Sequence, residues 1–408
     1  MVLRFLYLAN ARIPTEKAHG LQITQNCEAF ADAGAQVELW AARRFNTPEM
    51  SAVADEWAFY GVKRNFTLRR IPCLDLMPLV ATRIDFWARL AFYLQETTYL
   101  LILILRALFT RADVYYSRDP LTLLALSFFK ARHKLAYEPH SLSPSRAGKW
   151  LQRTVVQRVG SVFPVTNKLR HDLVELLSSP RKGDPFLVVH DGIRRERFAH
   201  LPSQAEARQV LGWPPDAFIV GYMGRLQTMA MDKGVGTLIA ALAQVEGVSL
   251  GLVGGPEEAA LEFREQWRKL NLDGAQFLYA GQVLPERVPL YLSAFDLCAM
   301  PFPWTTHFAY YASPIKLFEY MAARRAIVAS DLPSTAEVVK HDDSALLVPP
   351  GDVGALAAAV RRLREDSALR EHLADNAYQL VMSRYTWEAR ARAILEKIGK
   401  NTKEVRAE

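Results

Sequence analysis

Residues 218–225 read FIVGYMGR. The apolar run 218–223 is followed directly by a glycine and an arginine. An apolar run without regular polar alternation is typical of a strand that is buried on both faces of a parallel sheet. Four more such runs follow in the same half of the chain, at residues 249–253, 276–279, 297–300 and 326–329. Helical patterns separate these runs. This alternation predicts an α/β domain built on a doubly wound parallel sheet.

The first half of the chain shows the same alternation. We predict strands at residues 3–8, 36–41, 114–116, 135–137 and 161–165, with an amphipathic helix at residues 22–33 between the first two. The chain has 408 residues, half of them hydrophobic, which is more than one hydrophobic core usually spans. The sequence therefore predicts two Rossmann-like, doubly wound α/β domains that face each other across a cleft.

Polar and helical segments indicate the domain boundaries. The segment 194–215 is polar and charged, so we predict an N-terminal domain of residues 1–195 and a C-terminal domain of residues 196–380. Helical patterns follow at 353–365, 367–383 and 387–398, and residues 381–408 are predicted to form a closing helix. We expect the polar last ten residues to be frayed.

The charge and the cysteines bound the class of partner. The formal net charge of +7 suits an anionic partner such as a phosphorylated substrate, an acidic membrane surface or nucleic acid. The basic residues are dispersed and no nucleic-acid module is recognisable, so we expect no nucleic-acid partner. Cys27, Cys73 and Cys298 are far apart and have no metal-ligand or disulfide spacing. We therefore expect a cytoplasmic location and no structural metal site.

The most apolar stretch runs from Leu90 to Leu105 and is interrupted by Gln95 and Glu96. It is shorter than the roughly 20 apolar residues that a spanning helix needs. Two interpretations remain open: a core helix of the first domain, or a helix that docks on a bilayer surface. The run before Asn10 is too short for a secretory signal, and we expect a first buried strand there.

The strongest candidate site lies at residues 313–322, which read SPIKLFEYMA. Ser313 is suited to be an N-cap and Pro314 the first helical residue, so a helix is predicted to begin here. The free N–H groups and the positive end of such a helix bind anions such as a diphosphate. Glu319 lies about a turn and a half into the helix, where a carboxylate can accept hydrogen bonds from two ribose hydroxyls. An ordinary capped helix with a solvated glutamate is the alternative.

Two cations flank the loop after the first strand of the second half. Arg225 follows the strand directly, and Lys233 precedes the next helical pattern. An arginine and a lysine that converge can neutralise charge on a leaving diphosphate, a role that otherwise falls to a metal ion. Two solvated surface cations are the alternative. Gly254 and Gly255 end the next strand and would let the backbone approach a ligand closely, although a plain turn explains them equally well.

In the first half, polar groups follow two predicted strands. Arg118 and Asp119 follow the strand at 114–116, and Glu138 and His140 follow the strand at 135–137, so these side chains should face the crevice. His140 could position a hydroxyl or relay a proton, or it could be a hydrogen-bonded structural histidine. The loop 15–20, which contains His19 and Gly20, could close over phosphates, although one glycine is little for a cradle. The candidates for contacts with a second substrate, the acceptor, are His19, Arg118, Asp119 and Glu138.

Taken in order, these segments resemble the family 4 glycosyltransferases of the GT-B fold, also described as glycosyl transferases group 1, over nearly the whole chain. The likeness is most specific in the second half, at residues 224–225, 233–234, 253–255, 281–283 and 313–322, followed by 328–331. The resemblance implies a retaining enzyme that moves a sugar from a nucleotide-diphosphate sugar to an acceptor hydroxyl. It also implies that no metal and no cofactor is required, with the nucleotide sugar as substrate.

The resemblance also assigns roles to residues of this chain. Arg225 and Lys233 would grip the donor diphosphate and, with His140 beside the transferred sugar, make up the catalytic set. Glu319 would hold the ribose, and residues 281–283 would lie beside the base. The donor-binding residues implied are Gly20, Gly254, Gly255, Gly281, Val283, Tyr311, Ser313, Pro314, Ile315, Lys316 and Glu319. The segment 385–387 is similar to the one that crosses back onto the first domain.

One departure from the family concerns the sugar. The family often carries two glutamates with seven residues between them, and the position paired with Glu319 is Tyr311. The missing carboxylate usually contacts sugar hydroxyls, so the identity of the sugar stays open. The departure also makes an alternative conceivable, namely a non-catalytic nucleotide-sugar-binding subunit. A nucleotide-sugar epimerase remains a further alternative, whereas the absence of a recognisable pyridoxal lysine pocket disfavours a phosphorylase.

The acceptor is not decided by the sequence. A glycan, a lipid-linked glycan or a small molecule would each supply a hydroxyl, and a role in polysaccharide biosynthesis fits all but the last. The basic charge balance and the apolar helix near Leu100 favour a membrane-associated acceptor. We therefore expect an enzyme of the cytoplasm that makes peripheral contact with the inner face of the membrane.

Overall fold

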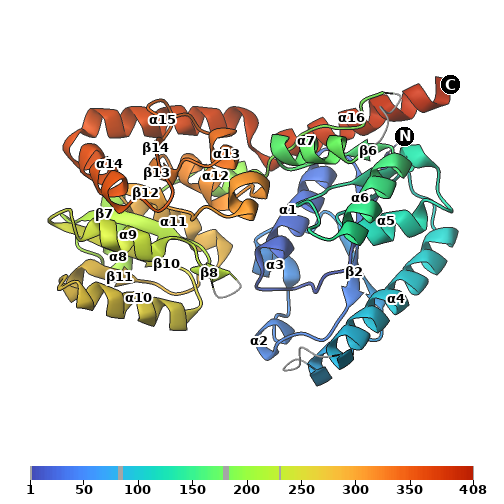
Figure 1. Cartoon of the computed structure of the whole chain (residues 1–408), viewed down its shortest axis with the longest axis horizontal. Coiled ribbons are helices and arrows are strands. Elements are labelled where there is room, and N and C mark those ends of the chain that lie inside the picture. The colour runs from blue at the N-terminus through green and yellow to red at the C-terminus, as the bar shows by residue number, and fades with distance from the viewer. Residues whose placement is uncertain (1, 81–85, 178–182, 229–230, 408) are drawn as a thin grey trace. The chain divides into compact units, whose positions relative to one another are not determined.

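The computed structural model describes residues 2–80, 86–177, 183–228 and 231–407. The chain divides into two compact units. Unit 1 consists of residues 1–190 and 387–408, and unit 2 consists of residues 191–386. Each unit is a six-stranded parallel sheet with helices along the chain between the strands (Figure 1).

The sheet of unit 1 has the strand order β3-β2-β1-β4-β5-β6. Its strands are β1 (Arg4–Ala9), β2 (Gln36–Arg43), β3 (Thr67–Pro72), β4 (Val114–Ser117), β5 (Leu135–Tyr137) and β6 (Ser161–Val162). Its helices are α1 (Ala18–Asp32), α2 (Pro48–Ser51), α3 (Glu56–Tyr60), α4 (Phe86–Phe109), α5 (Pro120–Leu126), α6 (Arg146–Arg158), α7 (Asn167–Glu175) and α16 (Trp387–Ala407), with short 3₁₀ turns η1 (Met77–Val80) and η2 (Arg132–Lys134). All pairings are parallel, and β1 is buried from Phe5 to Ala9.

The sheet of unit 2 repeats this topology in the order β11-β10-β7-β12-β13-β14. Its strands are β7 (Phe218–Met223), β10 (Val248–Val253), β11 (Phe277–Tyr279), β12 (Leu297–Met300), β13 (Ala326–Ser330) and β14 (Leu346–Val348), and a separate antiparallel hairpin pairs β8 (Gln227–Thr228) with β9 (Met231–Asp232). Its helices are α8 (Gln204–Leu211), α9 (Val235–Leu242), α10 (Glu257–Lys269), α11 (Val288–Ala294), α12 (Ile315–Ala322), α13 (Pro333–Ala336), α14 (Val353–Glu365) and α15 (Ser367–Arg384). Its short turns are η3 (Arg195–Phe198), η4 (Gly274–Gln276), η5 (Pro285–Arg287) and the π-helical η6 (His307–Tyr311). Two hydrophobic clusters pack on the sheet and its helices.

The predicted fold class of each unit is confirmed: both units are Rossmann-like and doubly wound. In each sheet the order of strands reverses beside the first strand, between β1 and β4 and between β7 and β12. Such a reversal leaves a crevice at the carboxyl ends of the two strands, and ligands of open α/β sheets bind there. The fold therefore predicts that ligands bind at the loops after β1, β4, β7 and β12.

The C-terminal helix differs from the prediction of frayed last residues. Helix α16 continues to Ala407. Asn401 is 7% exposed, and its amide nitrogen donates to the Gly160 carbonyl at 3.0 Å and to the Ser161 hydroxyl at 2.8 Å. These hydrogen bonds satisfy a buried amide and tie the last turns of α16 to unit 1, which local polarity alone did not indicate.

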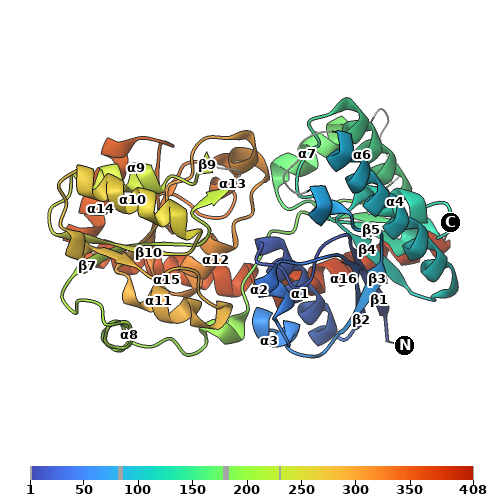
Figure 2. The same ribbon diagram turned by 90° about the horizontal axis from the view of Figure 1, so that it is seen from below.

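Helix α4 contains the most apolar stretch of the chain and runs along the side of unit 1 (Figure 2). Its buried residues recur every fourth position, at Ala91, Gln95, Tyr99, Leu103 and Ala107. The large side chains on its other faces are exposed, with 55% exposure at Trp87 and 57% at Leu101. The interpretation of this stretch as a core helix is therefore wrong, because a single stripe of the helix meets the protein.

Candidate active site

Glycines line the carboxyl ends of three neighbouring strands in unit 2. The Gly224 N–H after β7 donates to the Val253 carbonyl at 2.8 Å, and the Gly254 N–H after β10 donates to the Gly281 carbonyl at 2.6 Å. Gly224 and Gly254 have φ angles of +123° and +135°, which L side chains rarely adopt. A Cβ on Gly254 would lie 2.0 Å from the Gly224 carbonyl oxygen. These loops thus form a tightly packed floor at the edge of the sheet.

The two predicted glycines after β10 have different surroundings. Gly254 is required by the close approach of the protein's own backbone. At Gly255 the nearest atoms to an added Cβ belong to the Gln282 side chain, at 3.8 Å. The Gly255 carbonyl accepts the Leu226 N–H at 2.9 Å, which joins this loop to the segment after Gly224. Of the pair, Gly255 is the glycine with room for a ligand beside it.

A short hairpin carries Arg225 and Lys233 at its two ends. Strands β8 and β9 pair Gln227 with Asp232, and this brings the two cations back to the same end of the sheet. The Lys233 N–H donates to the Leu226 carbonyl at 3.2 Å. Burial, and then the charge of Arg225, lowers the pKa of Lys233 to about 8. The hairpin therefore brings the two predicted cations to one end of the sheet.

The strand switch point adjoins the same loop. Gly234 has a φ of +89°, and a Cβ on it would lie 1.7 Å from the Pro301 carbonyl oxygen. Pro301 follows β12, the strand at which the order of the sheet reverses. The backbone beside Lys233 thus packs against the loop after β12, so Lys233 lies at the crevice where doubly wound sheets bind ligands.

The helix predicted to start at Pro314 begins one residue later. Helix α12 starts at Ile315 with Pro314 as its N-cap residue, and no side chain caps it. The prediction that Ser313 is the N-cap is wrong, because the Ser313 hydroxyl instead accepts the Asp191 N–H at 2.8 Å. Without a side-chain cap, the first N–H groups of α12 are left for water or a ligand.

Glu319 and Lys316 project from α12 three residues apart. Burial raises the pKa of Glu319 to about 7, against the opposing charges of Arg197 and Lys316. Burial, and then the neighbouring Lys233, lowers the pKa of Lys316 well below its ordinary value, whereas Glu319 opposes that shift. Helix α12 therefore carries a carboxylate and an amine, three residues apart, whose charge states respond to whatever binds nearby.

The other predicted donor residues of unit 2 lie around this group. Gly281 has a φ of +52°, and its carbonyl accepts the Gly254 N–H. Val283 is partly buried and packs against the core cluster. Tyr311 is half-buried at the end of the turn η6 and contacts the Tyr310 ring, with 6.4 Å between centroids. The sequence position paired with Glu319 therefore carries a half-buried tyrosine.

A second polar cluster lies at the carboxyl ends of β4 and β5 in unit 1. Glu138 is fully buried and forms ion pairs with Arg118 at 3.0 Å and Arg390 at 3.2 Å. The His140 Nε2 lies 2.6 Å from the same carboxylate, and the Tyr116 hydroxyl donates to it. Burial alone would raise the pKa of Glu138, but Arg390, Arg118 and His140 hold it well below its usual range.

This cluster fixes the surroundings of His140. His140 is hydrogen-bonded to a buried carboxylate, which fixes the orientation of its imidazole ring and leaves it 31% exposed at the side chain. Arg390 comes from α16, and Tyr116 from β4, and sequence analysis identified neither. No local signal pointed to Arg390, since more than 250 residues separate it from Glu138.

The remaining first-half candidates have structural partners. Asp119 caps α5, where its carboxylate accepts the N–H groups of Leu121 and Thr122, both at 3.0 Å. His19 lies in the first turn of α1, and burial lowers its pKa to about 4. A Cβ on Gly20 would lie 2.4 Å from the Tyr60 hydroxyl, so packing explains this glycine.

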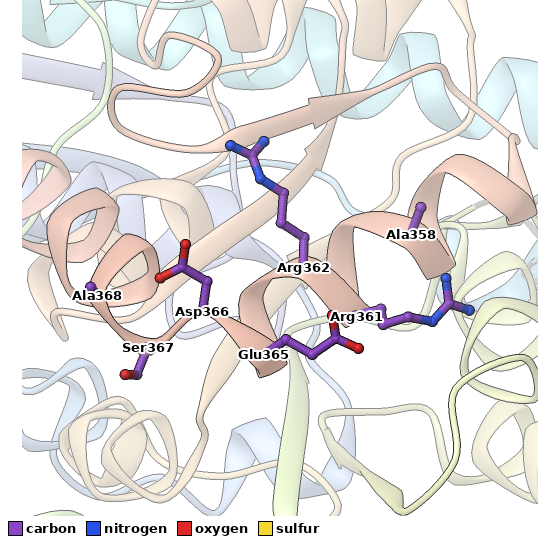
Figure 3. A pocket seen from close by; sticks show the side chains of 7 residues that line it. All are labelled: Ala358, Arg361, Arg362, Glu365, Asp366, Ser367 and Ala368. Carbon is purple, nitrogen blue, oxygen red and sulfur yellow. The ribbon is translucent and has the colours of Figure 1, made fainter.

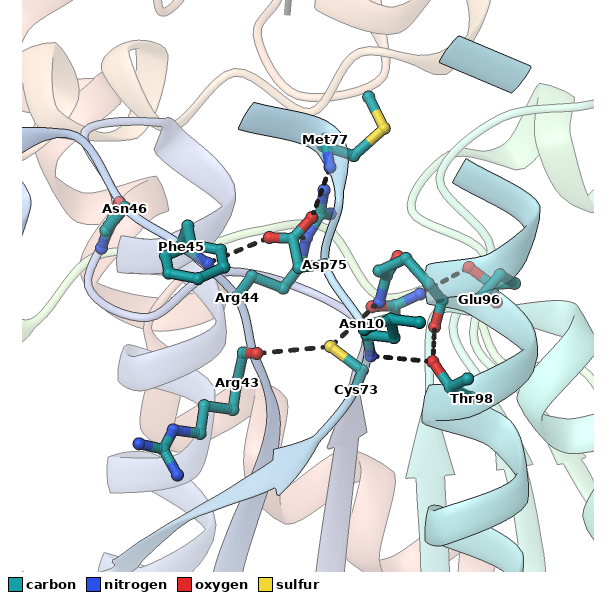
Figure 4. A network of polar contacts seen from close by, with 12 residues as sticks. Asn10, Arg43, Arg44, Phe45, Asn46, Cys73, Asp75, Met77, Glu96 and Thr98 are labelled. Atoms are coloured by element: carbon teal, nitrogen blue, oxygen red, sulfur yellow. Dashed lines mark hydrogen bonds and ion pairs between the residues drawn. The ribbon is translucent and has the colours of Figure 1, made fainter. Parts of the chain in front are cut away.

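Sequence analysis missed a polar network at the carboxyl ends of β1, β2 and β3 (Figure 4). The Gln95 amide donates to Asn10 at 2.9 Å and to the Cys73 sulfur at 3.5 Å, and Asn10 also donates to Glu96. Asp75 accepts the Phe45 N–H at 3.0 Å. Burial, and then the charge of Asp119, raises the pKa of Glu96 to about 7. The adjacent polar pair in the middle of an apolar helix was the signal that could have located this network.

One surface hollow of about 570 Å³ lies where α14 meets α15 (Figure 3). Three of the polar side chains that line it already have partners: Arg361 donates to the Gln244 carbonyl at 3.0 Å, Arg362 donates to Asp342 at 2.7 Å, and Asp366 caps α15. None of the predicted site residues lines it. The hollow therefore reflects the junction of two helices.

Metal ligands do not gather in the described part of the chain. Within residues 2–80, 86–177, 183–228 and 231–407, no group of three or more His, Cys, Asp or Glu side chains is placed to hold a metal ion. The positive charge of the candidate site comes from Arg225, Lys233 and the end of α12.

Comparison with known proteins supports the reading of unit 2. Residues 217–366 match the family model described as Glycosyl transferases group 1. The lipopolysaccharide core biosynthesis glycosyltransferase LpsD of Rhizobium meliloti is 32% identical over 205 residues, 48% of this chain and 53% of the relative. The alpha-D-kanosaminyltransferase of Streptomyces kanamyceticus is 28% identical over 262 residues, 59% of this chain and 60% of the relative. The chain thus spans little more than half the length of these relatives.

Solved structures resemble the whole chain. Sucrose-phosphate synthase from Thermosynechococcus elongatus has a TM-score of 0.74 at 21% identity, covering 99% of both chains. HepE of Anabaena in complex with UDP and glucose has a TM-score of 0.70 at 20% identity, covering 97% of this chain and 99% of the other. At such identities the likeness establishes the fold. The group 1 resemblance predicted from the sequence is confirmed, and the assignment to family 4 stays a prediction.

Proposed function

We propose that this chain, whose residues 217–366 match the glycosyl transferases group 1 family, is a glycosyltransferase that transfers a sugar from a nucleotide-diphosphate sugar to an acceptor hydroxyl. The observation that carries the proposal is the group of cations, glycine loops and uncapped helix start at the carboxyl end of the unit 2 sheet. Relatives over about half of the chain bear glycosyltransferase names, and HepE was solved with UDP and glucose.

Unit 2 is proposed to hold the donor. Arg225 and Lys233 bind the diphosphate, because two cations at one end of a sheet attract an anion that carries two charges. The uncapped start of α12 adds backbone N–H donors. Glu319 accepts hydrogen bonds from the ribose hydroxyls in its carboxylate form, and the segment 281–283 lies beside the base.

We propose a retaining reaction that needs no metal ion and no other cofactor. As the bond between sugar and diphosphate breaks, negative charge grows on the leaving phosphate oxygens, and Arg225 and Lys233 stabilise it. A phosphate oxygen accepts the proton of the incoming hydroxyl on the same face of the sugar. Loss of one such charge-stabilising donor lowers turnover by about 10²–10³ in well-studied enzymes.

Unit 1 is proposed to bind the acceptor. Arg118 and Arg390 hold Glu138 ionised, and Glu138 orients the His140 ring. A partly exposed imidazole in a fixed orientation can position an acceptor hydroxyl or pass on its proton. The network of Asn10 and Glu96 offers further hydrogen-bonding groups for acceptor hydroxyls.

The first experiment is a thermal-shift screen with UDP, GDP, ADP and several of their sugars in the presence of a chelator. A ligand that binds the folded protein raises its midpoint by mass action. A shift by one nucleotide supports a donor site that works without metal, and no shift by any of them contradicts the proposal.

Turnover then separates a transferase from a non-catalytic nucleotide-sugar-binding subunit. With the identified donor, R225A should hydrolyse or transfer labelled sugar at least 10- to 100-fold more slowly than the wild type. R268A is the matched control, because the Arg268 side chain is 75% exposed and pairs with Glu265 on α10. Wild-type binding without any hydrolysis or transfer would favour the subunit, and near-normal turnover of R225A would remove its assigned role.

We further propose a cytoplasmic protein that docks on the anionic inner face of a membrane through α4, where a lipid-linked acceptor would be presented. The exposed faces of α4 carry Trp87 and Leu101, and Arg89 and Arg106 are exposed at its two ends. The acidic residue of this helix, Glu96, is turned toward Asn10. Apolar and aromatic side chains with flanking cations are typical of helices that lie in the membrane interface.

Flotation with vesicles that contain an anionic lipid tests this docking. Wild type should float at low salt and float less at high salt, because screening weakens attraction to the surface. L101S should reduce flotation, whereas L261S should not, since Leu261 has the same exposure (56%) but lies on α10 of unit 2. Equal flotation of the two variants would contradict the assignment to α4.

A further inference from the structure

Lys316 carries an amine that no described residue satisfies. It lies in the first turn of α12, and its Nζ atom is buried without a hydrogen-bond partner in the part of the chain that the structure describes. The residue as a whole is only half-buried, so it is the charged end of the side chain that points inward. A buried amine without a partner costs free energy in the folded protein.

The surroundings of the amine are rings and backbone. The Nζ atom lies 3.8 Å from the centroid of the Tyr222 ring on β7 and 5.1 Å from that of Phe302 after β12. A Cβ on Gly224 would stand 3.1 Å from the same atom. The amine therefore lies between the ends of β7 and β12, at the crevice where the strand order reverses.

The fold opposes a positive charge at this position in three ways. Burial penalises the ammonium form, Lys233 repels it, and the first turn of a helix is its positive end. Two contacts favour the charge, namely Glu319 on the same helix and the face of the Tyr222 ring. The balance is a pKa of Lys316 well below its ordinary value.

The Lys316 amine has ring faces beside it but no hydrogen-bond acceptor among the described residues. Residues that break local rules without a structural compensation are expected at functional sites. The nearest recognisable anion site is the diphosphate position between Arg225, Lys233 and the start of α12. An anion there would supply the hydrogen-bond acceptors and the negative charge that the amine lacks.

We propose that Lys316 is uncharged in the free protein and takes up one proton from solvent when the diphosphate of a nucleotide sugar binds, and so becomes a third cation of the donor site. This inference rests on the proposed function. The ammonium group donates hydrogen bonds to phosphate oxygens. Because the diphosphate gains a negative charge when the sugar leaves, a charged Lys316 also favours the transition state over the bound donor.

Calorimetric titration tests this at pH 8 with UDP, GDP and ADP. The heat is measured in buffers of different ionisation enthalpy, which counts the protons taken up on binding. Wild type should take up about one proton more than K316M, and K316M should bind roughly 10- to 100-fold more weakly, the range of a hydrogen bond to a charged group. Lys233 and Glu319 titrate in both proteins and interact with Lys316, so the comparison measures the difference in total proton uptake that the Lys316 amine causes.

A structural role for Lys316 would give a different pattern. Without ligand, K316M should unfold at the same temperature as wild type or at a higher one, because the substitution removes a buried amine without a partner. K316Q serves as a second variant if K316M does not fold. K269M is the matched control, since Lys269 is exposed on α10, and it should match wild type in both measurements.

Three outcomes overturn the inference. Equal proton uptake and equal affinity of wild type and K316M would contradict it while leaving the donor site intact. A lower unfolding temperature of K316M with unchanged affinity would assign Lys316 to the fold. If none of the three nucleotides binds wild type, the donor site itself is contradicted, and the inference falls with it.

Discussion

Replacing Gly254 by alanine should disrupt the floor of the donor site. Gly254 has a φ of +135°, and the new Cβ would stand 2.0 Å from the Gly224 oxygen and 2.7 Å from the Gly224 carbonyl carbon. Both are backbone atoms, so no rotation of a side chain relieves the contact. The loop that carries Arg225 must move by about 1 Å before the Cβ reaches the shortest separation that real Cβ atoms show.

The magnitude follows from two costs. A backbone conformation that is unfavourable for alanine costs about 1–3 kcal/mol, and overpacking against a rigid neighbour costs a further ~1–3 kcal/mol. Unit 2 has the size at which 1 kcal/mol lowers the unfolding temperature by about 2–4 °C. G254A should therefore unfold roughly 4–24 °C below wild type, and it should respond more weakly to nucleotides because Arg225 is displaced.

The adjacent glycine is the control. A Cβ on Gly255 would make only ordinary van der Waals contacts, with the Gln282 side chain at 3.8 Å and the Glu257 backbone nitrogen at 4.0 Å. G255A should unfold within about 2 °C of wild type, as most substitutions free of clashes do. Both variants are measured by thermal unfolding with and without UDP. Equal unfolding temperatures of G254A, G255A and wild type would refute the argument that close packing of the loops requires Gly254.

Three further changes test buried polar groups by thermal unfolding. Burial raises the pKa of Glu319 to about 7, so between pH 4.5 and 7 the folded protein binds one proton more than the unfolded chain. The free energy of unfolding therefore falls as pH rises through that range, by up to about 3 kcal/mol, and E319Q should remove this fall. The pKa of Glu138 is held low by Arg390 and Arg118, so its contribution is present at neutral pH and lost in acid; E138Q should cost about 3–5 kcal/mol at pH 7 and much less near pH 3. The Tyr320 hydroxyl bonds both the N–H and the carbonyl of Met223, and Y320F should cost about 1–3 kcal/mol. A flat pH profile in wild type, or no change in Y320F, would contradict the respective argument.

The central strands could be predicted from the sequence, whereas the edges could not. Strand β7 was predicted with its observed bounds because six consecutive residues suit burial on both faces. Strand β3 reads TLRRIP, and half of it is exposed, so its strand character comes from the register with β2, which pairs Trp40 with Arg69. Strand β14 and the hairpin β8–β9 have only two or three residues per strand, too few for a periodic signal.

The positions of the candidate site residues along the strands and helices could be predicted from the sequence, whereas their local geometry could not. The sequence analysis placed Arg225, Lys233 and Glu319 at the ends of strands or on the helix after them, and the structure has them there. The N-cap prediction for Ser313 was wrong because its hydroxyl could accept a hydrogen bond either from α12 or from elsewhere. In the structure it accepts the N–H of Asp191, which is 122 residues away in sequence. Local propensity cannot rank a helix cap against a partner so distant in sequence.

The sequence was sufficient to determine the two doubly wound α/β units and the strand ends that carry the candidate site residues. This was possible because strand burial and helical period are local properties, visible in the order of apolar runs, helical patterns and loop residues. Tertiary structure alone decided the charge states of the site. Glu138 is ionised because Arg390, on the last helix, forms an ion pair with it. The Lys316 amine lacks a hydrogen-bond partner among the described residues because it packs against Tyr222 and Gly224. The pKa of a buried group is set by its burial and its neighbours, and these are known only once the chain has folded.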